Sequence, residues 1–202
     1  MASLRVSARR TLATTAAVVL LPRIAHAHLV NTGLGPFYDG VSHFALTPED
    51  VLPAIALALL AGQRGSLAAR RALLVLPLGW LLGGGVGLAF PTIGESPALT
   101  TASFLATGGL VAAEARLGPG WVTALAASLG LLHGYLNGSS LSPAPGALGL
   151  VGVVATLFVT VALAAALVVT IRAPWARVAV RVAGSWIAAV GLLMLGWSLR
   201  AG

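Results

Sequence analysis

The sequence has no cysteine, no lysine and few charged residues of any kind. Charged side chains make up 8% of the 202 residues, with five acids against twelve arginines, whereas a soluble domain carries about a quarter. The lack of cysteine excludes disulfides, thiolate metal sites and cysteine nucleophiles. There is also no P-loop and no dinucleotide-binding glycine motif, which argues against a nucleotide-driven pump.

Apolar residues dominate instead. They account for 58% of the chain, whose mean hydropathy is +0.96, and apolar runs of membrane-spanning length recur to its end. This composition predicts an all-α integral membrane protein with one compact domain. The formal net charge of +7 comes from arginines in short segments between apolar runs. Such a pattern indicates membrane topology and not a nucleic-acid surface.

The first 27 residues have the features of a secretory signal peptide. Three arginines precede an apolar stretch over residues 11–21, and an Ala-His-Ala sequence then fits the small-x-small cleavage pattern. We expect cleavage after Ala27, so that residues 28–202 form the mature membrane domain and His28 its N-terminus. The alternative is an uncleaved signal anchor.

The remaining apolar stretches predict a bundle of about six transmembrane helices. With the mature N-terminus outside, the seven arginines between Arg64 and Arg181 all fall in cytoplasmic loops, and only Arg200 falls outside. This arrangement obeys the positive-inside rule and places both mature termini in the periplasm of a bacterial cytoplasmic membrane. The predicted spans are approximately Thr47–Ala61, Ala72–Phe90, Ala98–Ala113, Trp121–Leu141, Ala147–Ile171 and Val182–Leu199.

Most side chains able to bind a metal lie in one external segment, residues 28–50. Pro36 could begin a short helix there, and four-residue spacing would then put Asp39 and His43 on one face. A carboxylate and an imidazole placed in this way can share one divalent ion. The alternative is an interfacial helix whose polar face meets water. The candidate ligands of this segment are His28, Asp39, His43, Glu49 and Asp50.

Glu49 and Asp50 follow a pattern typical of a helix start. Thr47 can cap the helix, Pro48 suits its first turn, and carboxylates favour the positive end of the helix dipole. Capping alone would explain these two acids, although they could also bind an ion. After signal cleavage, the free amine and imidazole of His28 would form a chelate that suits copper or nickel.

The other candidates lie in or near the third and fourth predicted spans. His133 falls within the fourth span, with Asn137 one turn further on the same face. Ionisable groups at membrane depth are costly and usually face a cavity or a partner, so this pair could guide an ion inward or simply bond between helices. Glu95 lies in the outer loop before the third span. A polar stripe along the third span could line a pathway or bond to backbone; its members are Thr100, Ser103, Thr107 and Glu114.

Together these features resemble the HupE/UreJ family. That family's first-span motif runs His-Pro-x-x-Gly-x-Asp-His, and residues 43–50 here read His-Phe-Ala-Leu-Thr-Pro-Glu-Asp. His43 matches, Glu49 replaces the aspartate, and Asp50 stands where the second histidine would be. In the fourth span the family often reads His-Gly-x-x-His-Gly, and Asn137 replaces the second histidine after His133. Glu95 is similar to the family glutamate before the third span, so the chain is identified as a divergent member.

The resemblance implies a nickel or related metal permease, or an accessory protein of hydrogenase or urease. We therefore expect no enzyme activity and no resident cofactor. The expected cargo is a divalent metal, first nickel and otherwise cobalt, copper, zinc or manganese. The expected partners are the metal ion, the bilayer and, for an accessory protein, a metalloenzyme maturation system. Loss of two imidazoles from the motifs makes the ligand set richer in oxygen. An intramembrane hydrolase has little support, because no serine nucleophile with a positioned base can be identified.

Overall fold

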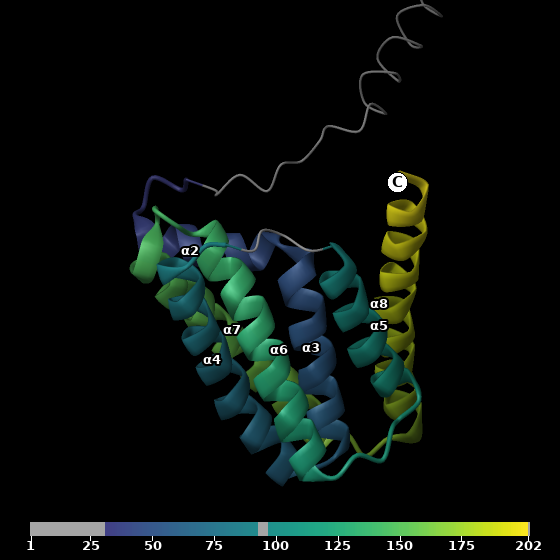
Figure 1. Cartoon of the computed structure of the whole chain (residues 1–202). Helices are drawn as coiled ribbons and strands as arrows, with labels where there is room; N and C mark the ends of the chain where they lie inside the picture. The colour runs from purple at the N-terminus through teal and green to yellow at the C-terminus, as the bar shows by residue number, and fades with distance from the viewer. Residues whose placement is uncertain (1–30, 93–96, 202) are drawn as a thin grey trace, which may run out of the picture.

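The computed structural model of the chain describes residues 31–92 and 97–201, which form seven α-helices and no strand (Figure 1). The prediction of an all-α fold is confirmed for these residues. The predicted signal peptide, together with His28 and Glu95, lies outside the described residues. The helices are α2 (Pro36–Leu46), α3 (Pro48–Gln63), α4 (Ser66–Ala89), α5 (Pro97–Ala112), α6 (Pro119–Ser140), α7 (Gly146–Thr170) and α8 (Pro174–Ala201).

The six predicted helices correspond to α3 to α8, and the short helix expected from Pro36 is α2. Helices α4 and α8 begin at Ser66 and Pro174, earlier than the predicted Ala72 and Val182. Contrary to the prediction, four of the seven arginines therefore lie in helices and not in loops, namely Arg70, Arg71, Arg177 and Arg181. Five of the seven helices begin with proline, namely α2, α3, α5, α6 and α8. Proline suits the first helical position, because its ring presets φ and its missing N–H would have no intrahelical partner there. The positions of the prolines in the sequence therefore explain where most of the described helices begin.

The number of spans supported by length and composition is smaller than the six predicted. Among the described residues, α4, α7 and α8 are long and apolar enough to cross a membrane, and α2 with α3 forms a pair bent by 72° that counts as a fourth. Helix α5 is apolar but has only 16 residues. Helix α6 is longer, yet its histidine, asparagine and glycines lower its hydropathy. These two helices pack within the bundle, so their spanning role stays a prediction.

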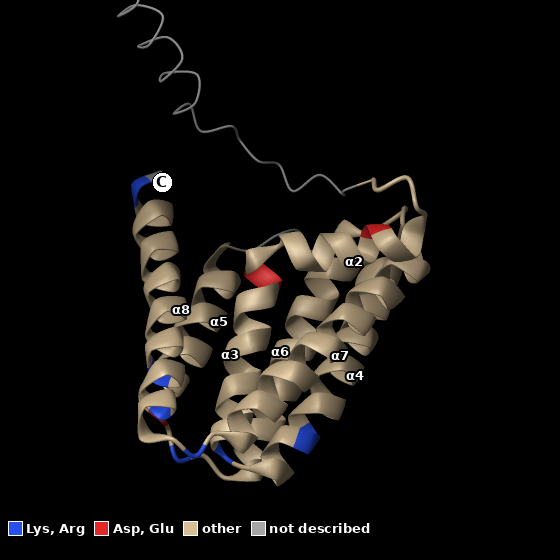
Figure 2. Cartoon of the chain, turned by 180° about the vertical axis from the view of Figure 1, so that it is seen from behind, with Lys and Arg blue, Asp and Glu red and all other residues tan. Residues whose placement is uncertain are grey.

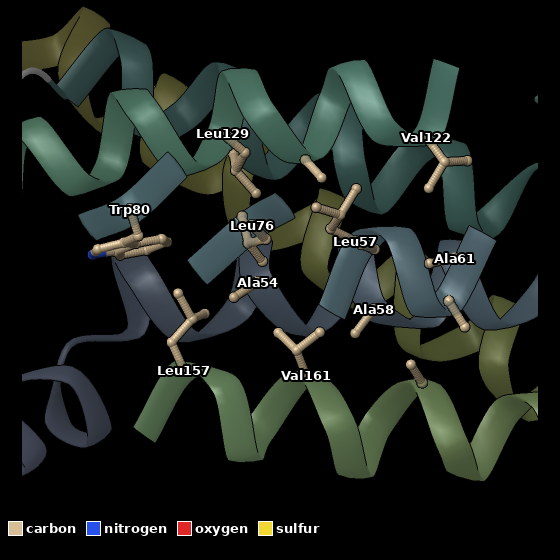
Figure 3. Packing of buried hydrophobic residues seen from close by; sticks show 14 of the residues in the cluster. Ala54, Leu57, Ala58, Ala61, Leu76, Trp80, Val122, Leu129, Leu157 and Val161 are labelled. Carbon is tan, nitrogen blue, oxygen red and sulfur yellow. The ribbon is translucent and has the colours of Figure 1, made fainter. Parts of the chain in front are cut away.

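Helix α3 lies at the centre of the bundle and contacts every other described helix. Figures 1 and 2 show α5 and α8 side by side at one edge, with α4 and α7 at the other. The apolar core forms around α3, where Leu57 packs near Leu76, Val122 and Leu157 from three neighbouring helices (Figure 3). Because α3 begins with residues 48–50, this central position carries Asp50 into the interior.

Most of the described arginines lie at one end of the bundle and the acids of α2 and α3 at the other, while Glu114 lies at the arginine-rich end (Figure 2). Figure 2 shows the arginines gathered at the end where α3, α5 and α7 finish, apart from the arginine near the C-terminus. Acidic residues on α2 and at the start of α3 lie at the opposite end. This separation is the pattern on which the predicted topology rests.

Glycines bring α4 and α6 into direct backbone contact. Gly83 and Gly87 on α4, and Gly134 and Gly138 on α6, each leave so little room that a Cβ would lie within 3.0 Å of the partner helix backbone. The spacing of four residues on both helices puts each pair on one face, as in small-residue packing of membrane helices. The C-terminal half of α6 is therefore held tightly against α4.

Candidate functional site

Four buried polar side chains from three helices meet near the end of the bundle opposite the arginines. Asp50 comes from the first turn of α3, Ser103 from α5, and His133 and Asn137 from successive turns of α6. His133 is 1% exposed and Asp50 is 4% exposed. Burial of ionisable groups to this degree in an apolar bundle is costly unless they are paired.

Hydrogen bonds connect these four side chains through both oxygens of Asp50. His133 Nδ1 lies 2.9 Å from Asp50 Oδ1, and the Asn137 side-chain amide donates to Asp50 Oδ2 over 2.8 Å. The second ring nitrogen, His133 Nε2, lies 3.1 Å from Ser103 Oγ. The carboxylate thus accepts from two α6 side chains and fixes the orientation of the imidazole. We refer to Asp50, Ser103, His133 and Asn137 as the polar cluster.

The hydroxyl of Ser103 is also within bonding distance of the Thr100 carbonyl oxygen, at 2.7 Å. Ser103 has one hydroxyl hydrogen, so it can donate either to that carbonyl or to His133 Nε2. Whichever acceptor it bonds, Ser103 links His133 to α5.

Aromatic rings enclose the imidazole. The Trp80 ring lies 5.5 Å from the His133 ring at an interplanar angle of 30°, and Phe44 meets Trp80 edge-on at 5.8 Å. Both Trp80 Nε1 and Asn137 Oδ1 are buried without a hydrogen-bond partner in the described part of the chain. Sequence reasoning missed Trp80 and Phe44. A signal for Trp80 was present, because it is the one large aromatic residue beside the glycines of α4.

Among the described residues, the other predicted ligands make no hydrogen bond to the polar cluster. His43 is buried on α2, whereas Glu49 is exposed on the first turn of α3. Asp39 Oδ1 accepts from both the backbone N–H and the hydroxyl of Thr32, each over 2.7 Å. These bonds, the backbone one foremost, lower the pKa of Asp39, which lies on the short helix α2 at the end of the bundle. In residues 31–92 and 97–201, no three histidine or acidic side chains are close enough to hold one metal ion.

The helix start at residues 47–50 differs from the expected capping. Thr47 makes no side-chain capping bond to α3, because its hydroxyl donates back to the His43 carbonyl at 2.6 Å. The Asp50 carboxylate bonds to α6 and not to its own helix end. Capping by side-chain hydrogen bonds was therefore wrong for Thr47, and it does not account for Asp50.

The predicted stripe on the third span is divided by the structure. Thr100, Ser103 and Thr107 are buried on α5, and the Thr107 hydroxyl donates to the Ser103 carbonyl oxygen over 2.6 Å. Bonding to backbone, one of the two interpretations, thus describes Thr107. Glu114 lies beyond the end of α5 at Ala112, at the arginine-rich end of the bundle. Ser103 is the stripe residue that the structure places beside His133.

A model of the family described as HupE / UreJ protein matches residues 16–194. The chain belongs to the HupE/UreJ family. No curated protein and no solved structure matches it. Family membership and the apolar helices identify a membrane protein.

The polar cluster contains Asp50 and Asn137, the two positions at which the resemblance to the HupE/UreJ motifs implies a histidine. They are 87 residues apart, and their side chains are hydrogen-bonded. On that comparison, a carboxylate and an amide stand in place of two imidazoles beside His133.

Proposed function

We propose that this protein is a divalent-metal permease of the bacterial cytoplasmic membrane, with the polar cluster as its ion-binding site. The observation that carries the proposal is the Asp50–His133 pair, joined over 2.9 Å and buried inside a helical membrane protein. Such pairs within membrane segments typically mark an ion pathway, because their burial is otherwise unfavourable. Membership of the HupE/UreJ family supports the same function.

The donor atoms of the polar cluster suit a divalent cation. Asp50 offers carboxylate oxygens, His133 offers a ring nitrogen, and Asn137 Oδ1 is buried without a partner among the described residues. Nickel is the expected cargo from the family, and the imidazole nitrogen is a ligand that it prefers. Because oxygen atoms replace two imidazoles, the site should also accept cobalt and manganese more readily than a histidine-rich site would.

Transport through this site would require no nucleotide. The arginine-rich end favours the cytoplasmic side, so the polar cluster would face the periplasmic half of the membrane. An inside-negative potential of 100 mV favours inward movement of a divalent ion by about 4.6 kcal/mol, twice the value for one charge. The membrane potential alone is therefore a sufficient driving force.

Flux through purified protein in liposomes tests this proposal. With an inside-negative potential, we expect uptake of nickel or cobalt. The Asp50→Asn variant should lose roughly nine-tenths of this uptake or more, because a buried carboxylate is the main attraction for the ion. Thr160→Val is the matched control, since it removes a hydroxyl that bonds only to its own helix at Thr156. Absence of flux for nickel, cobalt, copper, zinc and manganese would refute the permease.

A non-transporting accessory protein is the second candidate. All the buried polar side chains of the described residues lie on α2, the first turn of α3, α5 and the second half of α6, and the core towards the arginine-rich end is apolar. An ion bound at the polar cluster would find few ligands further inward. Metal binding by calorimetry without flux, together with a stoichiometric protein partner, would favour this function.

A further inference from the structure

A second candidate site lies at the arginine-rich end of the bundle, away from the polar cluster. It is a cavity of about 300 Å³ between the ends of α3, α5 and α7 and the start of α8. This volume is at the lower end of the range of small-ligand sites. Its polar lining includes Gln63, Glu114 and Arg177, and its apolar lining includes Val168, Ile171 and Val180.

Glu114 occupies a backbone position that is unfavourable for glutamate. Its φ is 50°, the only positive value at a non-glycine residue among the described residues. The Ala115 N–H bonds to Leu110 O and the Glu114 N–H to Val111 O, as in a Schellman motif whose corresponding residue is usually glycine. A carboxylate at a helix C-terminus also meets the negative end of the dipole. Helix termination alone therefore does not explain this side chain, and such exceptions often mark functional sites.

The other two polar residues of the cavity are also incompletely satisfied. The Gln63 amide donates to Val111 O over 3.3 Å, which leaves Gln63 Oε1 buried without a partner. Within the part of the chain that the structure describes, no ion pair joins Glu114 to Arg177. The cavity lining thus contains a carboxylate and a guanidinium that do not neutralise one another. A ligand complementary to these side chains carries both a cation that can donate hydrogen bonds and an anion within one chemical group.

Two tryptophans indicate the level of this cavity in the membrane. Trp121 at the start of α6 is 70% exposed and Trp175 at the start of α8 is 75% exposed, and both lie at the arginine-rich end. Exposed tryptophans of membrane proteins concentrate at the headgroup level of the bilayer. The valine and isoleucine wall provides an apolar surface beside the polar groups. At this level of the bilayer, the molecules that surround such a cavity are lipids, so a lipid is its expected ligand.

We propose that this cavity binds the headgroup of an aminophospholipid, the phosphatidylethanolamine class, from the adjacent leaflet. Arg177 binds the phosphate, as arginine does through paired N–H donors. The primary ammonium donates to the Glu114 carboxylate. A trimethylammonium headgroup has no N–H to donate to this acceptor, and a glycerol headgroup has no cation. The site therefore selects by headgroup, independently of any metal at the polar cluster.

Native mass spectrometry of the full chain in detergent tests this proposal with dioleoyl phosphatidylethanolamine, phosphatidylcholine and phosphatidylglycerol. We expect about tenfold tighter retention of phosphatidylethanolamine than of the other two, the size of effect of one charged hydrogen bond. Free phosphoethanolamine at equal concentration should compete poorly, because it lacks the acyl chains. Equal retention of the three lipids, or full competition by the free headgroup, would overturn the proposal.

Three variants connect the preference to the cavity. Glu114→Gln should abolish the preference for phosphatidylethanolamine over phosphatidylcholine, and Arg177→Gln should weaken retention of both. Arg116→Gln is the matched control, because Arg116 is a basic residue near the same end that does not line the cavity. Glu114→Gly should raise thermal stability by relieving the positive φ and still lose the preference. A preference that survives in both Glu114 variants would refute the assignment.

Discussion

Binding of nickel at the polar cluster should quench the emission of one tryptophan, Trp80. The chain has five tryptophans, and Trp80 is fully buried whereas Trp121, Trp175, Trp186 and Trp197 are 70–75% exposed. The Trp80 ring is also 5.5 Å from the His133 ring. A paramagnetic ion bound to that imidazole would therefore lie within contact range of a single indole.

The size of the effect follows from this arrangement. If the five indoles emit equally, saturating nickel should remove about one fifth of the total emission, and the loss should come from the blue-shifted part because Trp80 is shielded from water. The assay is a titration of the purified protein with nickel. Zinc, which has a filled d shell, should bind without comparable quenching.

Two variants make the result decisive. Trp80→Phe should abolish the quenching and keep the affinity measured by calorimetry, whereas His133→Ala should abolish both. Trp186→Phe, which removes an exposed indole, should leave the nickel-dependent change intact. Calorimetric nickel binding that leaves Trp80 emission unchanged would show that the ion binds elsewhere, and the assignment of the polar cluster would be wrong.

Three further predictions concern other features. The double variant Asp50→His/Asn137→His places histidines at the two hydrogen-bonded positions where the resemblance implies them. It should raise the ratio of nickel to manganese affinity, measured by calorimetry, roughly tenfold or more. An unchanged ratio would contradict the role of these positions. Gly134→Val places side-chain atoms against the α4 backbone and should lower the stability of the fold by about 3 kcal/mol or more. Gly85→Ala, whose added Cβ has nothing within 4 Å, should change stability little in a thermal assay. Equal effects of the two variants would refute the packing argument. Because Thr32 lowers the pKa of Asp39, the turn is stabilised above the ordinary aspartate pKa and loses that stabilisation as the pH falls through the lowered value. Protection of the Thr32 amide from exchange, relative to its intrinsic rate at each pH, should therefore fall in acid, and Asp39→Asn should remove this dependence.

Sequence reasoning was most successful for local structure. Proline and apolar run length located α3 to α8, because both signals act within one helix. The polar cluster was named residue by residue, since ionisable groups are rare in an apolar chain. The hydrogen bonds within the polar cluster were not predictable, because Asp50 and His133 are 83 residues apart and no pattern along the chain indicates that they are in contact.

The misses have physical causes of the same kind. Asp39 and His43 have the spacing of one helix face, yet Asp39 bonds to Thr32, which precedes the helix. Thr47 has a good capping sequence, but its hydroxyl donates to the carbonyl of His43, four residues earlier at the end of α2, as threonine commonly does on a helix. In both cases a neighbouring group of the chain competed with the expected partner. Trp80 was missed because its role depends on a ring from another helix.

The glycine contacts determine which parts of the molecule can move. Helices α4 and α6 meet backbone to backbone, so sliding or tilting one against the other would cause steric overlap at Gly83 and Gly134. Helices α5 and α8 form a separate pair at the edge of the bundle, joined closely at Gly108 and Gly184. A motion that displaces α5 and α8 and preserves their contact must therefore move them together as one unit. The bond between Ser103 and His133 crosses that boundary, and it would break as the unit swings away.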